Sequence, residues 1–438
     1  MGKYLMKKIR NIVLLMMIGS TLGLIALVVV HYIPLDKIKC HVQQSVPMLE
    51  RDFLYGDAIE GYPASCVGSF TDCLMLEHAV YFSKEHSVLE QVLFMYRGES
   101  SEGDGWAPGY SLIDYLSGVS QNREVEYSRY WHGYLVILKP LLYFMSFNGI
   151  RTLASCIQLL LVAMVLMLCF QKYEKILGFG FLASMPFLYF SNLYLSLSLS
   201  ICFYLLVILV IIQIMWNDRI YDSHRYEEFF VIAGMITAYF DFLTYPLVTL
   251  GFPLCIYLYL NASKWKDSLK QMVTNSVAWA VGYLGLWAMK WVFTDILAGG
   301  NTIQDAISTI FQRTGNAEGY SKMAGFISVV IKNLDAYANW AFYITSFVII
   351  ISVISLLIIS RKQLMKGNLG CTLSILIVGL YPFVWFFLTQ NHSEEHWLFT
   401  CKIMSISVFA FVCATGKIFR LKERGNYSCG SLKEIDSF

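Results

Sequence analysis

The chain has 438 residues, of which 57% are hydrophobic and only 15% are charged, and its formal net charge is +2. A soluble domain carries roughly 25% charged residues, so this composition excludes an ordinary soluble protein. The basic residues are scattered and form no basic face, so we expect no nucleic-acid partner. The composition is that of a membrane protein.

Long uncharged runs predict membrane-spanning helices. Roughly 18 to 20 apolar residues cross the hydrocarbon as a helix. Runs that reach or exceed this length lie at 11–30, 152–170, 176–216, 338–360 and 369–388. The alternation of inward and outward residues that is typical of membrane β-barrels is missing. The sequence therefore predicts an all-α, polytopic helical bundle.

The first run follows the basic start MGKYLMKKIR and continues to residue 33. A signal peptide has a shorter apolar stretch and a small-residue cleavage site, and VVVHYIPL offers no such site. We interpret residues 1–33 as a cytoplasmic amino terminus followed by the first transmembrane helix.

Residues 34–133 are predicted to form a large extracytoplasmic first loop, far longer than a usual connection. Two stretches in it, TDCLMLEHAVYF and SVLEQVLFMYRG, are typical of short helices. The second begins with Ser87 and has Glu90 three residues later, which is the pattern of a capping box. We therefore expect this loop to be folded.

Clusters of lysine and arginine are typical of cytoplasmic connections and assign the topology. Such clusters occur at 1–10, 171–175, 217–225, 264–270, 361–366 and 416–424. The connections left for the outside are the first loop, 191–192, 241–245, 297–335 and 389–396. This predicts about ten spanning helices, with a membrane bundle over 134–418, an outer loop at 297–335 and a cytoplasmic tail at 419–438.

The segment 134–147 is short and carries Lys139 and Pro140. An odd number of crossings must separate the outer first loop from the inner cluster at 171–175, but two apolar segments lie between them. We therefore interpret the segment 134–147 as interfacial, so that only the second one crosses. An ordinary tilted helix, with NGIR as an inside loop, is the alternative that the sequence leaves open.

Ionisable residues in membrane segments are costly and are candidates for function. Asp241 precedes a helix break, because Pro246 disfavours helical geometry at Tyr245. Basic residues of the outer segments form a predicted positive collar, which suits a phosphate carried on a lipid: Arg129, His132, Lys139, Lys290, His392, His396 and Lys402. The alternative for each lysine is that its ammonium group reaches toward the lipid headgroups.

Asp72 is the candidate catalytic base. The stretch SFTDCLML places it in the first turn of a very apolar helix, and apolar neighbours raise the basicity of a carboxylate. Asp57, in FLYGDAIEG, is the alternative.

His392 and His396 lie four residues apart, as the two zinc ligands of an H-E-x-x-H helix do. The glutamates in HSEEH have the wrong offset for that site, so we expect these histidines to bind phosphate or sugar hydroxyls. No metal or other cofactor is expected, since a divalent metal has no support in the sequence.

With its long first outer loop, early acidic residue, uneven helices and outer basic residues, the chain resembles the GT-C class of membrane glycosyltransferases. These enzymes use polyprenyl-phosphate sugars. The blocks FTDCLMLEHA, SRYWHGYLVILKPLL, DFLTYPLVTLGFPL and QNHSEEHWLFT are similar to blocks of multi-pass proteins from Gram-positive bacteria.

The resemblance implies transfer of a sugar from a polyprenyl-phosphate donor to a cell-envelope glycan or lipid acceptor, outside the bacterial cell membrane and with inversion. Asp72 would be the base. Arg129, Lys139 and Lys402 would hold the phosphate, with His132 and His392 donating to it. Four further residues would complete the substrate site: His396 of the collar, and Trp131, Asp241 and Tyr245. The class often has an acidic pair in this loop, whereas GSFTDC has a single aspartate.

A transporter or flippase for a lipid-linked sugar is the alternative function. Such proteins bind their substrate near the bilayer midplane, between repeated halves with broken helices. The sequence shows ionisable residues only toward the outer ends of the spans and no repeated halves, so we favour the enzyme.

Overall fold

The computed structural model describes residues 2–52, 56–100, 107–119, 123–173, 175–262, 264–317, 319–340, 342–344, 346–347, 351 and 369–427. Within them the chain is all-α, as predicted. It has 20 helices in this described part. It also contains a two-stranded antiparallel sheet, β1 (Arg97–Glu99) with β2 (Arg123–Val125).

Five helical segments are long and apolar enough to cross a membrane: Met6–His31, Phe147–Gln171, Leu197–Asp222, Gly370–Leu388 and Trp397–Lys417. The chain is thus a multi-pass membrane protein. Most of the predicted span at 338–360 and all of the basic cluster at 361–366 lie outside the described residues. The count of about ten spans therefore stays a prediction.

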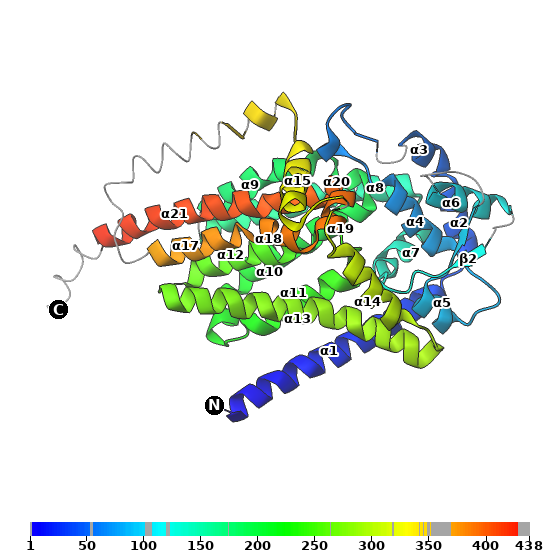
Figure 1. The fold of residues 1–438 in the computed structure, drawn as a ribbon, viewed down its shortest axis with the longest axis horizontal. Coiled ribbons are helices and arrows are strands. Elements are labelled where there is room, and N and C mark those ends of the chain that lie inside the picture. The colour runs from blue at the N-terminus through cyan, green and yellow to red at the C-terminus, as the bar shows by residue number, and fades with distance from the viewer. Residues whose placement is uncertain are drawn as a thin grey trace, which may run out of the picture.

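The long helices run along the longest axis of the molecule, with α1 inclined to the others (Figure 1). They are α1 (Gly2–His31), α8 (Phe147–Leu168), α9 (Lys175–Leu188), α10 (Leu197–Asp222), α11 (Tyr226–Phe240), α12 (Val248–Asn261), α13 (Trp265–Ala298), α17 (Leu369–Val378) and α21 (Ser405–Tyr427). A π-turn, η2 (Cys169–Tyr173), follows α8, and the 3₁₀ turn η3 (Phe190–Leu195) precedes α10.

Helices α11 and α13 pack backbone against backbone. A Cβ atom on Gly234 would lie 2.1 Å from the carbonyl oxygen of Trp279, and one on Gly282 would lie 2.0 Å from that of Val231. Only glycine permits this approach, which is how small residues let membrane helices associate.

The first loop is folded and covers one end of the bundle, which we call the loop end (Figure 1). Its elements are α2 (Leu35–Gln43), α3 (Val46–Arg51), η1 (Pro63–Ser65), α4 (Ser69–Val80), α5 (Val88–Phe94), α6 (Ala107–Ser117) and the small sheet. The predicted capping box of Ser87 and Glu90 is confirmed at the start of α5.

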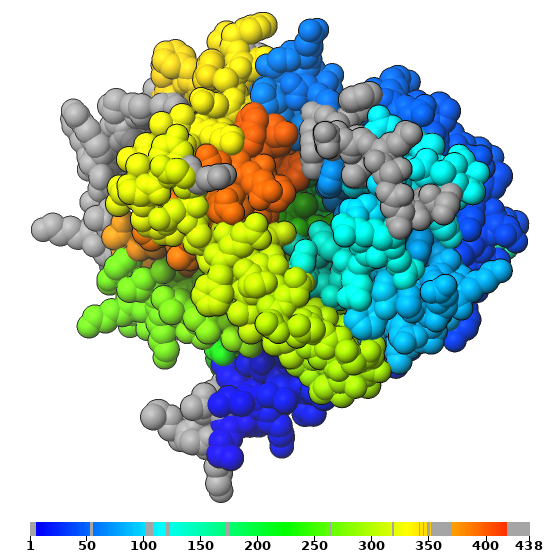
Figure 2. Space-filling model, turned by 45° about the vertical axis from the view of Figure 1, so that its right-hand side comes forward, coloured from blue at the N-terminus to red at the C-terminus, as the bar shows by residue number. Residues whose placement is uncertain are grey.

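Other segments predicted to lie outside gather on the same face. Figure 2 shows α14 (Thr302–Arg313) in yellow-green and residues near 390–404 in orange beside the blue and cyan first loop. The orange residues form α19 (Gln390–Glu395), α20 (Trp397–Thr400) and η5 (Cys401–Met404), which follow α18 (Tyr381–Leu388).

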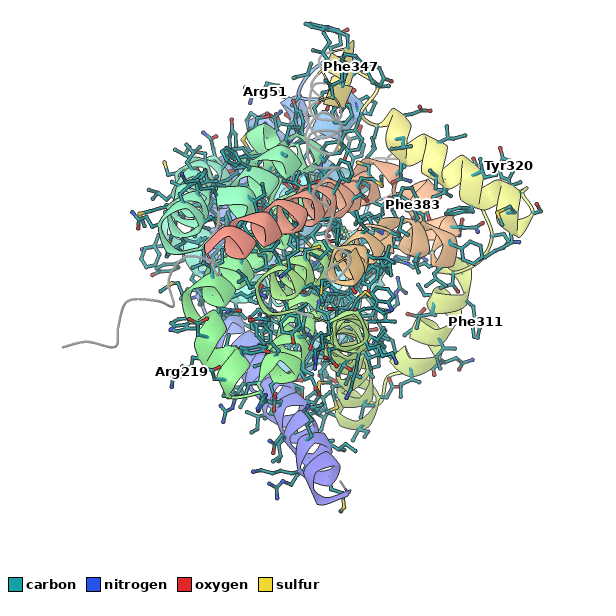
Figure 3. The ribbon with its side chains drawn as sticks, turned by 90° about the vertical axis from the view of Figure 1, so that its left-hand side faces the viewer. Arg51, Arg219, Phe311, Tyr320, Phe347 and Phe383 are labelled. Atoms are coloured by element: carbon teal, nitrogen blue, oxygen red, sulfur yellow. The ribbon has the colours of Figure 1, made fainter. Side chains whose placement is uncertain are left out.

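Helices α14 and α15 (Lys322–Asp335) lie at the side of the bundle, and Phe311 and Tyr320 reach the edge of the molecule (Figure 3). These two side chains are 73% and 49% exposed. Such an apolar surface is suited to contact with lipid.

Helix α7 (Leu135–Phe144) has ten residues and contains Pro140. Ten residues of helix rise about 15 Å, roughly half the hydrocarbon thickness. Its length agrees with the interfacial interpretation and does not allow a complete helical crossing.

Buried lysines attach the first loop to the bundle. Lys290 of α13 donates to the carbonyl oxygens of Val92 and Leu93, both at 2.8 Å, near the end of α5. Lys139 of α7 donates to the carbonyl oxygen of Ala79, at 3.0 Å, near the end of α4. The carboxyl end of a helix carries partial negative charge and unpaired carbonyls, so each ammonium group satisfies a helix end.

Replacement of Lys290 by methionine keeps most of the side-chain volume but removes the ammonium donor from the Val92 and Leu93 carbonyls, and Leu93 keeps only the long hydrogen bond from the Thr294 hydroxyl at 3.4 Å. Unsatisfied buried groups cost about 1 to 3 kcal/mol each. We expect a lower melting temperature in detergent and faster proteolysis of the first loop. The exposed Lys266 provides the control, Lys266→Met. Equal stability of the two variants would contradict the role of Lys290 in attaching the first loop to the bundle.

The orientation of the loop end can be tested by labelling. In a background with Ser at the exposed Cys40 and Cys156, Glu60→Cys marks the loop end and Lys270→Cys the opposite end. We expect a membrane-impermeant maleimide on intact cells to label only Glu60→Cys, because the basic clusters place the opposite end inside. Labelling of Lys270→Cys alone would reverse the topology.

Candidate functional site

Asp72 binds the amino-terminal end of α10. Its Oδ1 accepts hydrogen bonds from the backbone N–H of Ser198 at 2.9 Å and from the Ser198 hydroxyl at 2.8 Å. Its Oδ2 accepts from the backbone N–H of Leu197 at 2.9 Å. Unpaired N–H groups and the helix dipole make this end of a helix a favourable place for a carboxylate. Asp72 therefore fixes where α10 begins.

Burial raises the pKa of Asp72, whereas Arg151 and the hydrogen bonds from Ser198 and Leu197 lower it. The side chain is fully buried, and both of its oxygens accept hydrogen bonds. The predicted role as a base requires a free lone pair on one of these oxygens. Oδ1 also accepts from the Ser196 hydroxyl at 3.3 Å, whereas Oδ2 accepts only from Leu197 among the described residues, so Oδ2 is the atom that can take a proton.

Arg151, at the start of α8, was not among the residues predicted from the sequence. Its Nη1 donates to a carboxylate oxygen of Asp52, and its Nη2 lies 4.0 Å from Oδ2 of Asp72. The side chain is 5% exposed. Its Nε and Nη2 atoms are buried and have no hydrogen-bond partner among the described residues. Buried donors are nearly always paired, so these two atoms point to a missing acceptor.

An apolar groove of about 360 Å³ opens beside Arg151, between α7, α8, η3 and α10. Arg151 is the one charged residue in the described lining. The remaining wall is aliphatic and aromatic, and includes Leu141, Ala154, Ile157, Leu161, Leu205 and Ile208. The groove thus combines an apolar channel with a cation that has unused donors.

The cations predicted to hold a phosphate have other partners in the structure. Lys402 donates to the carbonyl oxygen of Ala64 at 3.1 Å, and Lys139 is bound to Ala79. Arg129 forms an ion pair with Asp305 at 2.7 Å. These contacts join outer segments to one another, and the structure does not gather the three cations around Asp72.

Trp131 and His132 form part of the packed interior at the loop end. The indole N–H of Trp131 donates to the carbonyl oxygen of Leu286 at 2.7 Å. The His132 Nε2 atom donates to the carbonyl oxygen of Tyr127 at 2.8 Å, and its Nδ1 lies 3.1 Å from the Tyr134 hydroxyl. Both ring nitrogens of His132 thus have partners within the protein.

The turn at 241–245 lies between α11 and α12 in the chain, and it contacts both α10 and α19. Asp241 accepts hydrogen bonds from the backbone N–H and the hydroxyl of Thr244, which closes the turn. The Tyr245 hydroxyl donates to the carbonyl oxygen of Leu199. Asp241 and Tyr245 are therefore close to the helix end that Asp72 binds.

His392 reaches the same turn, where its Nε2 lies 3.0 Å from the carbonyl oxygen of Leu243. Burial lowers the pKa of His392, so the ring is neutral and Nε2 carries the proton. Its Nδ1 is then a buried acceptor that has no partner within the described part of the chain. The His396 ring lies 4.8 Å from that of His392, centre to centre.

Asp57 is exposed, and its backbone pairs with that of Cys66. Among the described residues, no group of three or more His, Cys, Asp and Glu side chains could hold a metal ion.

No protein-family model, curated protein or solved structure matches this chain. The resemblance to the GT-C class therefore rests on the sequence motifs alone and stays a prediction.

Asp72→Asn tests the capping role of Asp72. The asparagine amide group would place a donor against the N–H groups of α10, and the structure predicts a loss of about 1 to 3 kcal/mol. We expect a lower melting temperature in detergent, and no loss for the exposed-residue control Glu60→Gln. A variant as stable as the parent would contradict the capping role and leave catalysis as the function of Asp72.

Proposed function

We propose that the protein is a membrane glycosyltransferase, which moves a sugar from a polyprenyl-phosphate donor to a cell-envelope glycan or lipid acceptor at the outer face of a bacterial cell membrane. The observation that carries this proposal is the groove that ends at Arg151. An isoprenoid chain needs an apolar channel open to the bilayer, and its phosphate needs a cation at the channel's end. The groove supplies the apolar channel. The two unpaired nitrogens of Arg151 supply the cationic donors for the phosphate.

In this proposal Arg151 takes the role that the sequence suggested for Arg129, Lys139 and Lys402. Guanidinium groups bind phosphate oxygens through two parallel hydrogen bonds. Asp52 and Asp72 lie on either side of the guanidinium group and orient it. The lipid phosphate gains charge as it leaves, and Arg151 stabilises that charge in a site shielded from water.

The reaction follows from these positions. An acceptor hydroxyl oxygen attacks the anomeric carbon, and the bond from that carbon to the phosphate oxygen breaks with its electron pair going to the phosphate. The hydroxyl proton passes to a carboxylate. Asp72 is our candidate for this base because it lies next to Arg151, and the exposed Asp57 is the alternative.

One observation favours the alternative, a transporter or flippase for a lipid-linked sugar. A polar cavity of about 560 Å³ lies at the end of the bundle away from the loop, lined by Lys8, Glu227 and Lys270 among others. Transport needs access from both sides of the membrane. Proteoliposomes that move a lipid-linked sugar across the bilayer without transferring it would favour this function.

Ala154→Trp tests the groove by filling it. Ala154 lines the groove, whereas Leu160 lies on the same helix, 70% exposed and outside the lining. We expect Ala154→Trp to reduce crosslinking of a radiolabelled, photoreactive polyprenyl phosphate about tenfold or more, a loss of at least 1.4 kcal/mol in binding. Leu160→Trp should crosslink normally.

The same pair of variants should differ in cells. Cells with Ala154→Trp should lose the envelope glycan that a deletion strain lacks, and cells with Leu160→Trp should retain it. Equal crosslinking of the two variants would overturn the assignment of the groove.

A further inference from the structure

Three buried polar atoms that have no hydrogen-bond partner among the described residues lie in one region of the loop end. They are the Tyr283 hydroxyl, the Trp287 indole N–H and the Nδ1 atom of His392. The three side chains are 3%, 8% and 2% exposed. A buried polar atom without a partner destabilises the fold, because it has lost its hydrogen bonds to water. Such a group of atoms is typical of a site that a polar ligand completes.

Aromatic contacts show that these side chains share a neighbourhood. Tyr283 and Trp287 lie one turn apart on α13, with ring centres 4.9 Å apart. Tyr130 packs edge-on against Trp287 at 5.7 Å and against Phe242 at 5.5 Å. Phe242 precedes Leu243, whose carbonyl oxygen binds His392.

Arg313, at the end of α14, brings a positive charge to this region. Its guanidinium group lies 6.0 Å from the centre of the Tyr130 ring. Burial lowers the pKa of both His392 and His396, and the charge of Arg313 contributes to each lowering. Arg313 is therefore close to both histidines.

The nearby carboxylates do not neutralise this charge. Asp305 is paired with Arg129, and Asp241 accepts the hydrogen bonds of its own turn. No carboxylate of the described residues forms an ion pair with Arg313. The exposed Glu395 partly offsets the lowering of the His396 pKa.

We call this region the outer recess and define it by Tyr130, Phe242, Tyr283, Trp287, Arg313 and His392. Figure 2 shows the face on which it lies, where the cyan, yellow-green and orange segments that carry Tyr130, Arg313 and His392 meet. The turn at 241–245 joins it to the start of α10 through Tyr245 and Leu199. The outer recess thus adjoins the helix end that Asp72 and the groove share.

We propose that the outer recess binds an anionic sugar unit, one that bears a carboxylate or a phosphate, and that this unit belongs to the acceptor glycan. The assignment to an acceptor rests on the proposed function. Aromatic rings pack on the C–H faces of a sugar. The Tyr283 hydroxyl, the Trp287 N–H and the His392 Nδ1 atom bind its hydroxyl groups, and Arg313 binds its negative group.

The test measures binding to the full-length protein in detergent by calorimetry, with glucose, glucuronic acid, glucose 1-phosphate and inorganic phosphate as probes. We expect at least one of the two anionic sugars to bind tenfold or more tightly than glucose. Inorganic phosphate should bind more weakly than the sugar phosphate, because it lacks the sugar face. Which anionic sugar binds more tightly distinguishes a carboxylate from a phosphate.

Arg313→Gln should remove the preference for the anionic sugars and leave weak glucose binding. The control is Arg123→Gln, which removes an arginine of the first loop that pairs with Glu99. Trp287→Phe keeps a ring but loses the N–H, so it should weaken all sugars by a similar factor. An unchanged preference in Arg313→Gln, equal binding of glucose and the anionic sugars, or phosphate binding as tight as glucose 1-phosphate would overturn the proposal.

These outcomes are separable from those of the proposed function. Polyprenyl-phosphate crosslinking that depends on Ala154, without binding of anionic sugars, overturns the outer recess and leaves the transferase proposal. Binding of anionic sugars that depends on Arg313, without selective crosslinking, supports the recess and removes the evidence for a lipid donor.

Discussion

The structure depends on charged side chains that bind the ends of helices. Lys139 and Lys290 donate to carbonyl groups at the carboxyl ends of α4 and α5. Asp72 accepts from N–H groups at the amino end of α10, and Asp295 does the same at the start of α14. In each case the sign of the charge opposes that of the helix end. A buried charge without such a partner would be far too costly in this apolar interior.

These attachments decide which cation is available for a ligand. An ammonium group that already donates to backbone carbonyls has fewer hydrogens left for a phosphate, and moving it would leave the carbonyls unsatisfied. Arg151 differs because a guanidinium has five N–H hydrogens and can bind Asp52 while keeping others free. The chemistry of the two side chains therefore makes Arg151, and not Lys139 or Lys402, the cation best suited to an incoming anion.

The sequence predicted features that depend on neighbouring residues. The uncharged run at 11–30 is within α1, the run at 152–170 covers most of α8 and the start of η2, and the capping box was recognised from Ser87 and Glu90. The number of spans was not settled, because most of the run at 338–360 is outside the described residues.

Partners far apart in the chain could not be predicted. Lys139 and its acceptor are 60 residues apart, Arg151 and Asp52 are 99 apart, and Lys290 and Val92 are 198 apart. The pattern of a single sequence gives the approximate depth of a charge in the membrane, but not the group that it meets. Arg151 was not recognised as a site residue for this reason. The sequence also could not show that the polar atoms of Tyr283 and Trp287 lack partners among the described residues, because both residues fit the apolar pattern of a membrane span.

The turn at 241–245 brings the two candidate sites together. Tyr245 binds the first turn of α10, where Asp72 is anchored, and Leu243 binds His392 of the outer recess. Transfer of a sugar requires the donor's anomeric carbon and the acceptor hydroxyl to meet within about 3.5 Å. In the proposed mechanism, a donor held by Arg151 and an acceptor held in the outer recess would therefore meet near this turn. The hydrogen bonds from Thr244 to Asp241 close the turn, and in this proposal the fold sets the relative position of the two substrates.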